Sequence, residues 1–158
     1  MADGWTRVLI LGSLPGEVSL ERRQYYANPT NQFWRLTGAV IEKDLVALPY
    51  HDRLSALLGA GIGLWDVVKS ARRTGSSDSE IRDHKPNALG EIAGALPSLK
   101  AIAFNGGKSF AIGRKQLGGD DTHVLVALPS SSAAYCSIPF ERKQSEWLQL
   151  RAFLDRAA

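Results

Sequence analysis

Four short runs of apolar, β-branched-rich residues are spread along the sequence, and segments with helical spacing separate them. The runs cover 7–11, 62–68, 101–104 and 123–128, each with Gly, Pro or Ser close by. The segments with helical spacing cover 32–40, 52–58, 88–96, 108–117 and 142–157. Strands that alternate with helices form a parallel sheet with helices on both faces. The pattern therefore predicts an α/β fold, a three-layer α/β/α sandwich around a central, mainly parallel four-stranded sheet.

The length of the chain fits one domain. Its 158 residues are 44% hydrophobic, enough to bury a single core, so we expect one domain over residues 1–158. In the last helical segment Trp147, Leu150 and Leu154 fall at i, i+3 and i+7, which predicts an apolar stripe that packs on the sheet. The segment 70–86 is polar and rich in arginine, and we expect it to be a surface loop.

Charge and cysteine content restrict the function classes. The 19 Lys and Arg residues exceed the 16 Asp and Glu residues, a formal charge of +3 that mildly favours a polyanionic partner. The single cysteine, Cys136, excludes an intrachain disulfide and a cysteine-ligated iron–sulfur cluster, and the three histidines lack metal-site spacing. No apolar stretch approaches membrane length. We expect a cytoplasmic protein of bacterial type, associated with the nucleoid, without metal, cofactor, membrane or obligate protein partner.

The expected ligand site lies beyond the carboxyl ends of the strands, where ligands bind in open parallel sheets. The segments there read "GSLPG" (12–16), "WDVVK" (65–69), "FNGGKS" (104–109) and "LPSSSAAY" (128–135). Neither glycine-rich segment matches a nucleotide-binding pattern. "FNGGKS" lacks the first glycine of a phosphate-binding loop, and Pro15 removes an amide that a dinucleotide pyrophosphate would need.

Five segments, taken in order, resemble the uracil-DNA glycosylase superfamily. They read "LILGSLPG", "YYANPTNQFWRL", "GIGLWDVV", "AFNGGKSF" and "VALPSSSAAY", and the resemblance lies near the mismatch-specific and hypoxanthine-excising branches and divergent bacterial uracil-DNA glycosylases. It implies a three-layer α/β/α domain that flips a damaged nucleotide out of DNA and hydrolyses its N-glycosidic bond without metal or cofactor. The expected substrate is DNA that contains uracil or another deaminated base. Alternatives are a hypoxanthine-preferring glycosylase and a non-catalytic nucleic-acid-binding module of the same fold.

Excision of a flipped base requires a narrow pocket, a stacking face and amides near the base carbonyls. Under the resemblance, Tyr26 aligns with the stacking aromatic residue, whereas Phe33 and Trp34 are expected in the core. Leu14 stands where many family members carry a water-activating Asp or Asn, and Leu128 stands where others carry a His or Asn. The predicted base pocket comprises Gly12, Ser13, Leu14, Pro15, Gly16, Tyr26, Asn105 and Leu128, with Asn105 open to a loop-capping role instead.

Two residues are the candidates for catalysis. Asn31 maps onto an asparagine of the hypoxanthine-excising branch, and an amide can orient a water molecule against the sugar; its alternative role is to cap the helix that begins near Gln32. Asp66 stands where the superfamily usually has a base-reading asparagine. A carboxylate can accept the N3–H of uracil or the N1–H of hypoxanthine. Its alternative role is a cap or a salt bridge to Lys69 or Arg72.

The segment "LPSSSAAYCSIPF" is expected to compress the DNA backbone and to fill the vacated stack. The alternatives are that this segment is a serine-rich turn without function and that the predicted Arg and Lys residues are ordinary solvated cations. The predicted DNA-binding residues are Arg72, Arg73, Ser130, Ser131, Ser132, Tyr135, Arg142 and Lys143.

Overall fold

The computed structural model describes residues 1–13, 17–66, 68–72, 82–86, 89–118 and 122–154. Its central sheet has four strands in the order β2-β1-β5-β6, and every neighbouring pair is parallel. The strands are β1 (Val8–Gly12), β2 (Ile62–Asp66), β5 (Ala101–Asn105) and β6 (Val124–Leu128). All four coincide with the apolar runs of the sequence, so the predicted α/β fold is confirmed.

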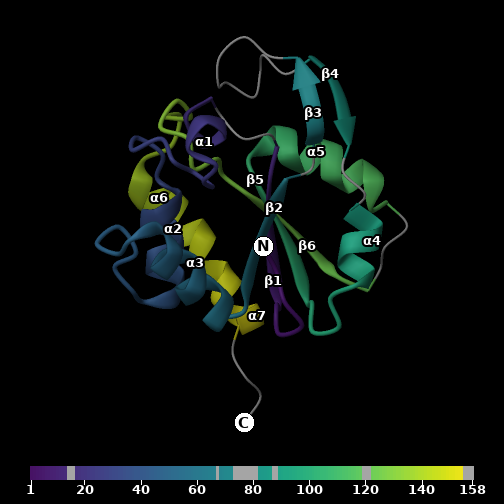
Figure 1. The fold of residues 1–158 in the computed structure, drawn as a ribbon, viewed down its shortest axis with the longest axis horizontal. Helices are drawn as coiled ribbons and strands as arrows, with labels where there is room; N and C mark the ends of the chain where they lie inside the picture. Colours follow the sequence, from purple (N-terminus) through teal and green to yellow (C-terminus); the bar gives the residue numbers. More distant parts are fainter. Residues whose placement is uncertain (14–16, 67, 73–81, 87–88, 119–121, 155–158) are drawn as a thin grey trace.

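Helices cover both faces of the sheet (Figure 1). On one side lie α1 (Glu17–Arg22), α2 (Phe33–Ile41), α3 (Tyr50–Gly59), α6 (Phe140–Trp147) and α7 (Arg151–Leu154), and on the other lie α4 (Leu89–Gly94) and α5 (Gly107–Gln116). Of these, α1 was not expected from the sequence. Among the described helices, none is long and apolar enough to cross a membrane.

The alternation of side chains along β1 explains the two hydrophobic clusters. Val8 and Ile10 join the larger cluster under α2 and α6, whereas Leu9 and Leu11 join the cluster under α4 and α5. All four side chains are at most 1% exposed. Neither face of this strand is exposed to solvent, which explains why the four residues are all apolar.

The C-terminal segment is helical, as expected, but it is not one helix. It divides into α6, a 3-10 turn (Leu148–Leu150) and α7. The expected stripe packs on the core, since Trp147 and Leu150 are fully buried and Leu154 is partly buried against the same cluster. Trp147 Nε1 also donates to the carbonyl of Pro129 at 2.9 Å, which ties α6 to the loop after β6.

The prediction of a loop over 70–86 is wrong for the residues that the structure describes. Strands β3 (Val68–Arg72) and β4 (Arg82–Pro86) pair as an antiparallel hairpin outside the central sheet. Main-chain hydrogen bonds hold such a ladder without the alternating apolar residues that the sequence pattern requires. The hairpin follows β2 directly and stands above α5 in Figure 1.

Candidate functional site

The strand order creates a crevice at the carboxyl end of β1. From β1 the sheet continues to β2 on one side and to β5 and β6 on the other, and ligands of open parallel sheets bind at such a reversal. The register pairs Gly12 with Asp66 and Asn105 with Leu128, at the ends of their strands. The structure therefore brings the carboxyl ends of all four strands, from which the predicted segments begin, to one edge.

Gly12 lies where two polar side chains converge. A Cβ atom at this position would lie 2.9 Å from Asp66 Oδ1 and 3.0 Å from the hydroxyl oxygen of Tyr26. Both oxygens therefore reach the same point over the end of β1, and only glycine leaves room for them. Ser13, the next residue, is 4% exposed.

Tyr26 is held from several directions. Its ring stacks on Phe33, with centroids 3.7 Å apart and planes at 12°, and Trp34 Nε1 donates to its carbonyl at 3.2 Å. Phe33 and Trp34 are 0% and 5% exposed, so both belong to the core, as expected. Because Phe33 covers one face of the Tyr26 ring, a flipped base can stack only on the other face.

Asn31 uses its carbonyl oxygen within the protein. Oδ1 accepts from the Phe33 backbone N–H at 2.9 Å and from Ser131 Oγ at 2.8 Å. The Phe33 N–H can only donate, which fixes which atom of the amide is the oxygen. The N-cap residue of α2 is Gln32, without a side-chain cap bond, so Asn31 is not the N-cap but accepts the first N–H of the helix from the residue before it. Nδ2 has no hydrogen-bond partner in the described part of the chain, so it can donate to a ligand or a water molecule.

Asn105 is bound to the loop after β6. Its Oδ1 accepts from the Ser131 N–H at 2.8 Å, and its Nδ2 donates to Ser131 Oγ at 2.8 Å and to the Tyr26 hydroxyl at 3.2 Å. The side chain is 6% exposed. With its oxygen and its NH₂ group both engaged, Asn105 has the geometry of the loop-capping alternative rather than that of a base contact.

Lys143 is buried, although the sequence predicts a phosphate contact. It is 1% exposed, and Nζ donates to Gln32 Oε1 at 2.9 Å and to the Ser132 carbonyl at 3.1 Å. Burial lowers the pKa of its ammonium group, partly offset by Cys136. The geometry does not support a phosphate contact by Lys143. The same holds for Ser131, which is 1% exposed and whose hydroxyl is engaged with Asn31 and Asn105.

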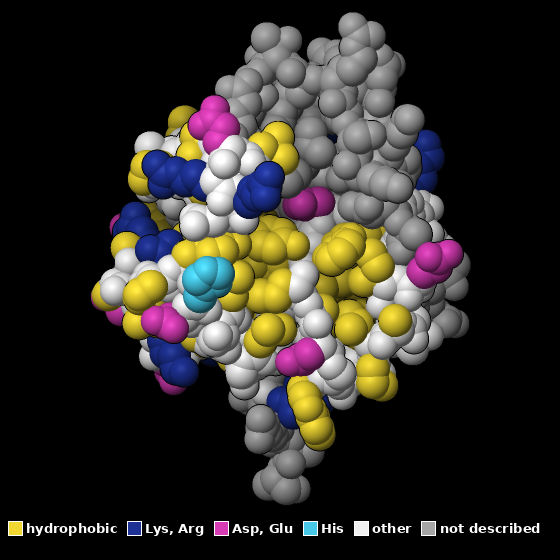
Figure 2. Space-filling model, in the orientation of Figure 1, with side chains coloured by type: hydrophobic (Ala, Val, Ile, Leu, Met, Phe, Trp, Pro, Cys, Tyr) yellow, Lys and Arg dark blue, Asp and Glu magenta, His cyan; other side chains and the backbone are white. Residues whose placement is uncertain are grey.

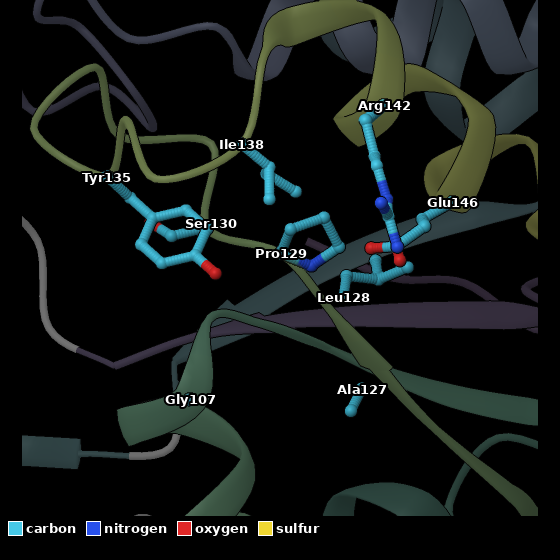
Figure 3. A pocket seen from close by; sticks show the side chains of 9 residues that line it. All are labelled: Gly107, Ala127, Leu128, Pro129, Ser130, Tyr135, Ile138, Arg142 and Glu146. Atoms are coloured by element: carbon cyan, nitrogen blue, oxygen red, sulfur yellow. The ribbon is translucent and has the colours of Figure 1, made fainter.

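A surface groove of about 400 Å³ lies beside the loop after β6 (Figure 3). Ser130, Tyr135 and Arg142 line it, three residues predicted to bind DNA. Tyr135 is 42% exposed and Arg142 is exposed, so a ligand can reach both. The other residues that line the groove are Gly107, Ala127, Leu128, Pro129, Ile138 and Glu146. Asn31 and Asp66 do not line this groove, so the candidate residues form two groups.

Several predicted residues lie outside the described residues: Leu14, Pro15, Gly16 and Arg73. Arg72 ends β3, opposite Arg82. Ser132 is half-buried, and Leu128 is 4% exposed within the larger cluster. Within the described ranges no group of three His, Cys, Asp or Glu residues could hold a metal ion.

Tyr25 is a neighbour of Asp66 that no motif of the sequence indicates. Burial, followed by the charges of Asp66 and Tyr50, raises its pKa to about 12. The hydroxyl of Tyr25 is therefore protonated at neutral pH. The negative charge of Asp66 contributes to this rise in pKa. The sequence signal was weak, because Tyr25 and Tyr26 are adjacent and only the structure separates their roles.

Comparison with known proteins identifies the family of the chain. The family model of the uracil DNA glycosylase superfamily matches residues 2–152. A hypoxanthine DNA glycosylase from Methanosarcina acetivorans is 42% identical over 146 residues, which cover 92% of this chain and 90% of the relative. One from Methanosarcina barkeri is 48% identical over 107 residues, 68% of each chain.

A solved structure has the same fold. The solution NMR structure of a candidate uracil DNA glycosylase from Methanosarcina acetivorans superposes with a TM-score of 0.84 at 39% identity and covers 96% of this chain and 93% of that chain. The sequence resemblance is thereby confirmed at the level of the family. The chain belongs to the uracil DNA glycosylase superfamily and is a DNA glycosylase.

Proposed function

We propose that the protein is a monofunctional DNA glycosylase that excises hypoxanthine, with uracil as a second substrate. The sequence favoured uracil, with hypoxanthine as the alternative, but the curated relatives are named hypoxanthine DNA glycosylases and so support the alternative. The observation that carries the proposal is the meeting of Asp66 Oδ1 and the Tyr26 hydroxyl over Gly12.

The carboxylate of Asp66 suits a deaminated base. Hypoxanthine presents an N1–H donor, whereas adenine presents an unprotonated N1 whose lone pair a carboxylate repels. Uracil and cytosine differ in the same way at N3. Asp66 can accept the ring N–H of either deaminated base, because a carboxylate has two oxygens and can accept from more than one donor. Asp66 would thus reject adenine and cytosine in undamaged DNA.

Asn31 would hold the water molecule that attacks the sugar. Its Oδ1 is engaged, so Nδ2 is the atom that can bind the water oxygen. In the reaction the bond from C1′ to the base nitrogen breaks, the water hydroxyl adds to C1′, and the water proton ends on the departing base. The sugar becomes oxocarbenium-like and negative charge grows on the base, so a placed water and donors near the base supply most of the rate.

The proposal is tested with labelled duplexes that contain hypoxanthine, uracil or xanthine at one position, treated with protein and then with alkali to cleave abasic sites. We expect strand cleavage fastest at hypoxanthine, slower at uracil and absent from a matched adenine duplex. Cleavage without alkali would contradict the monofunctional assignment. Binding of the duplexes without excision of any base would leave the non-catalytic nucleic-acid-binding alternative.

Asp66 provides the first prediction. Asp66→Ala leaves the ring N–H of the base unpaired, a loss of about 1–3 kcal/mol that slows single-turnover excision of hypoxanthine and uracil by about 10- to 100-fold. Asp66→Asn retains the shape and adds two donors, so measurable excision remains and weak cytosine excision is gained. Excision by Asp66→Ala at the parental rate would instead assign Asp66 a capping or salt-bridge role.

A second prediction concerns the forces that hold DNA. Arg142 is exposed in the groove, Arg72 lies on the hairpin, and Lys and Arg side chains gather along one side of the face in Figure 2. Contacts to several phosphates release counterions, so affinity for undamaged duplex should fall by about 100-fold or more between about 50 and 200 mM salt. Fluorescence anisotropy at several salt concentrations measures the slope. A flat dependence would contradict a phosphate-based interface.

A further inference from the structure

We propose that Lys143 is a positioning residue for base excision, which clamps the segment that carries Asn31 against the loop that carries Ser131. The proposal rests on the proposed function, because it assigns Asn31 the water. It gives Lys143 a role that differs from the phosphate contact expected from its charge.

The ammonium group of Lys143 bridges two segments that are far apart in the sequence. Nζ donates to Gln32 Oε1, 111 residues away, and to the Ser132 carbonyl on the loop after β6. It also lies 5.3 Å from the centroid of the Tyr135 ring, within the range of a cation–π contact. Gln32 is the residue after Asn31, and Ser132 is the residue after Ser131. Lys143 therefore links the two segments one residue beyond the hydrogen bond between Ser131 and Asn31.

Two further hydrogen bonds join the same segments. The Gln32 N–H donates to the Ser131 carbonyl at 2.8 Å, and Ser131 Oγ donates to Asn31 Oδ1 at 2.8 Å. Lys143 therefore closes a set of contacts that fixes the Asn31 amide relative to the end of the sheet. Without Nζ, Gln32 Oε1 and the Ser132 carbonyl lose a shared donor, and the two segments are free to separate.

Packing alone does not explain a lysine at this position. Transfer of an ammonium group from water to a site that is 1% exposed is unfavourable unless hydrogen bonds compensate it, and an apolar side chain of similar length would fill the space without that penalty. The ammonium group donates to two acceptors and lies beside the ring of Tyr135, and an apolar side chain could make none of these contacts. A placement error of about 1 Å at a reacting group can slow a reaction by about 100-fold, so a clamp of this kind has a measurable effect on rate.

The test separates rate from affinity. Lys143→Met fills the same space and removes the charge. We expect single-turnover excision at saturating DNA to slow by at least about 10-fold, within the range that misplacement produces. The dissociation constant and its salt dependence should change little, whereas the melting temperature should fall by a few degrees, because two acceptors lose their donor. Exposed Lys115→Met on α5 is the charge-matched control and should behave as the parent protein.

Arg142→Met, at the preceding residue of α6, serves as a contrast. Arg142 is exposed in the groove, and its loss should weaken binding and reduce the salt slope by about one. If Lys143→Met instead weakens binding and reduces the slope in this way, Lys143 contacts phosphate and the proposal is wrong. An unchanged rate at saturating DNA together with a lower melting temperature would overturn it equally, because Lys143 would then be only structural.

Coupling to Ser131 identifies the route of the effect. If Lys143 acts through Ser131 and Asn31, Lys143→Met should slow Ser131→Ala much less than it slows the parent protein, whereas independent roles predict multiplied effects. Should Lys143→Met fail to fold, Gln32→Met removes one of the two acceptors and should also slow excision at saturating DNA; an unchanged rate in that variant would refute the clamp. A parent protein that excises no deaminated base would reject the proposed function itself, a different outcome.

Discussion

Asn31→Ala is expected to slow single-turnover excision of hypoxanthine at least about 100-fold, about 2.7 kcal/mol in activation free energy. The reason is that Asn31 Nδ2 is the donor without a partner in the described part of the chain, while Oδ1 is bound to Phe33 and Ser131. The melting temperature should fall by a few degrees, because alanine also removes the acceptor of the Phe33 N–H, a hydrogen bond worth about 1 kcal/mol.

Asn31→Ser separates these two effects. A serine hydroxyl can accept the Phe33 N–H and preserve this hydrogen bond, but it cannot replace the NH₂ group of the amide. We therefore expect Asn31→Ser to melt closer to the parent protein and to remain as slow as Asn31→Ala. Parental excision by either folded variant would remove Asn31 from the mechanism.

Gly12→Ala is expected to abolish most excision, by about 100-fold, through displacement of Asp66 and Tyr26. The added methyl group would lie 2.9 Å from Asp66 Oδ1, closer than such atoms approach in proteins, and 3.0 Å from the Tyr26 hydroxyl oxygen, a tight contact. At least one side chain must move. Since β1 is central and buried, the strand itself is the least free to shift.

Gly59→Ala is the matched control for this substitution. Gly59 ends α3, is exposed, and has no atom within 4 Å of its Cβ position. Single-turnover rates and melting curves of both variants should show a loss confined to Gly12→Ala. Equal activity of the two variants would mean that neither Asp66 nor Tyr26 needs its observed place.

The central sheet was predictable because its signal is local. Residues 8–11 and 101–104 are continuously apolar, as strands buried on both faces must be, and β1 and β5 lie there. The hairpin of β3 and β4 was not predictable in this way. Its strands read "VKSAR" and "RDHKP" and carry no apolar alternation, and main-chain pairing leaves no pattern in side-chain type.

The candidate site shows the same division. The sequence predicted that the strands end at one edge of the sheet, because alternating strands and helices are enough to predict a parallel sheet. The partners of Lys143 could not be foreseen, because Gln32 lies 111 residues away and charge alone suggests exposure. Asn105 likewise showed two possible roles until its bonds to Ser131 and Tyr26 were visible.

The paired hydrogen bonds between Asn105 and Ser131 bear on how free energy is distributed between folding and binding. The amide of Asn105 receives the Ser131 N–H and donates to its hydroxyl, much as one further peptide unit would extend the ladder of β5 and β6. The conformational entropy of this turn is therefore lost when the chain folds, before DNA arrives. Association with DNA then carries no ordering penalty at Ser131, and the cost resides in the thermal stability of the free protein instead.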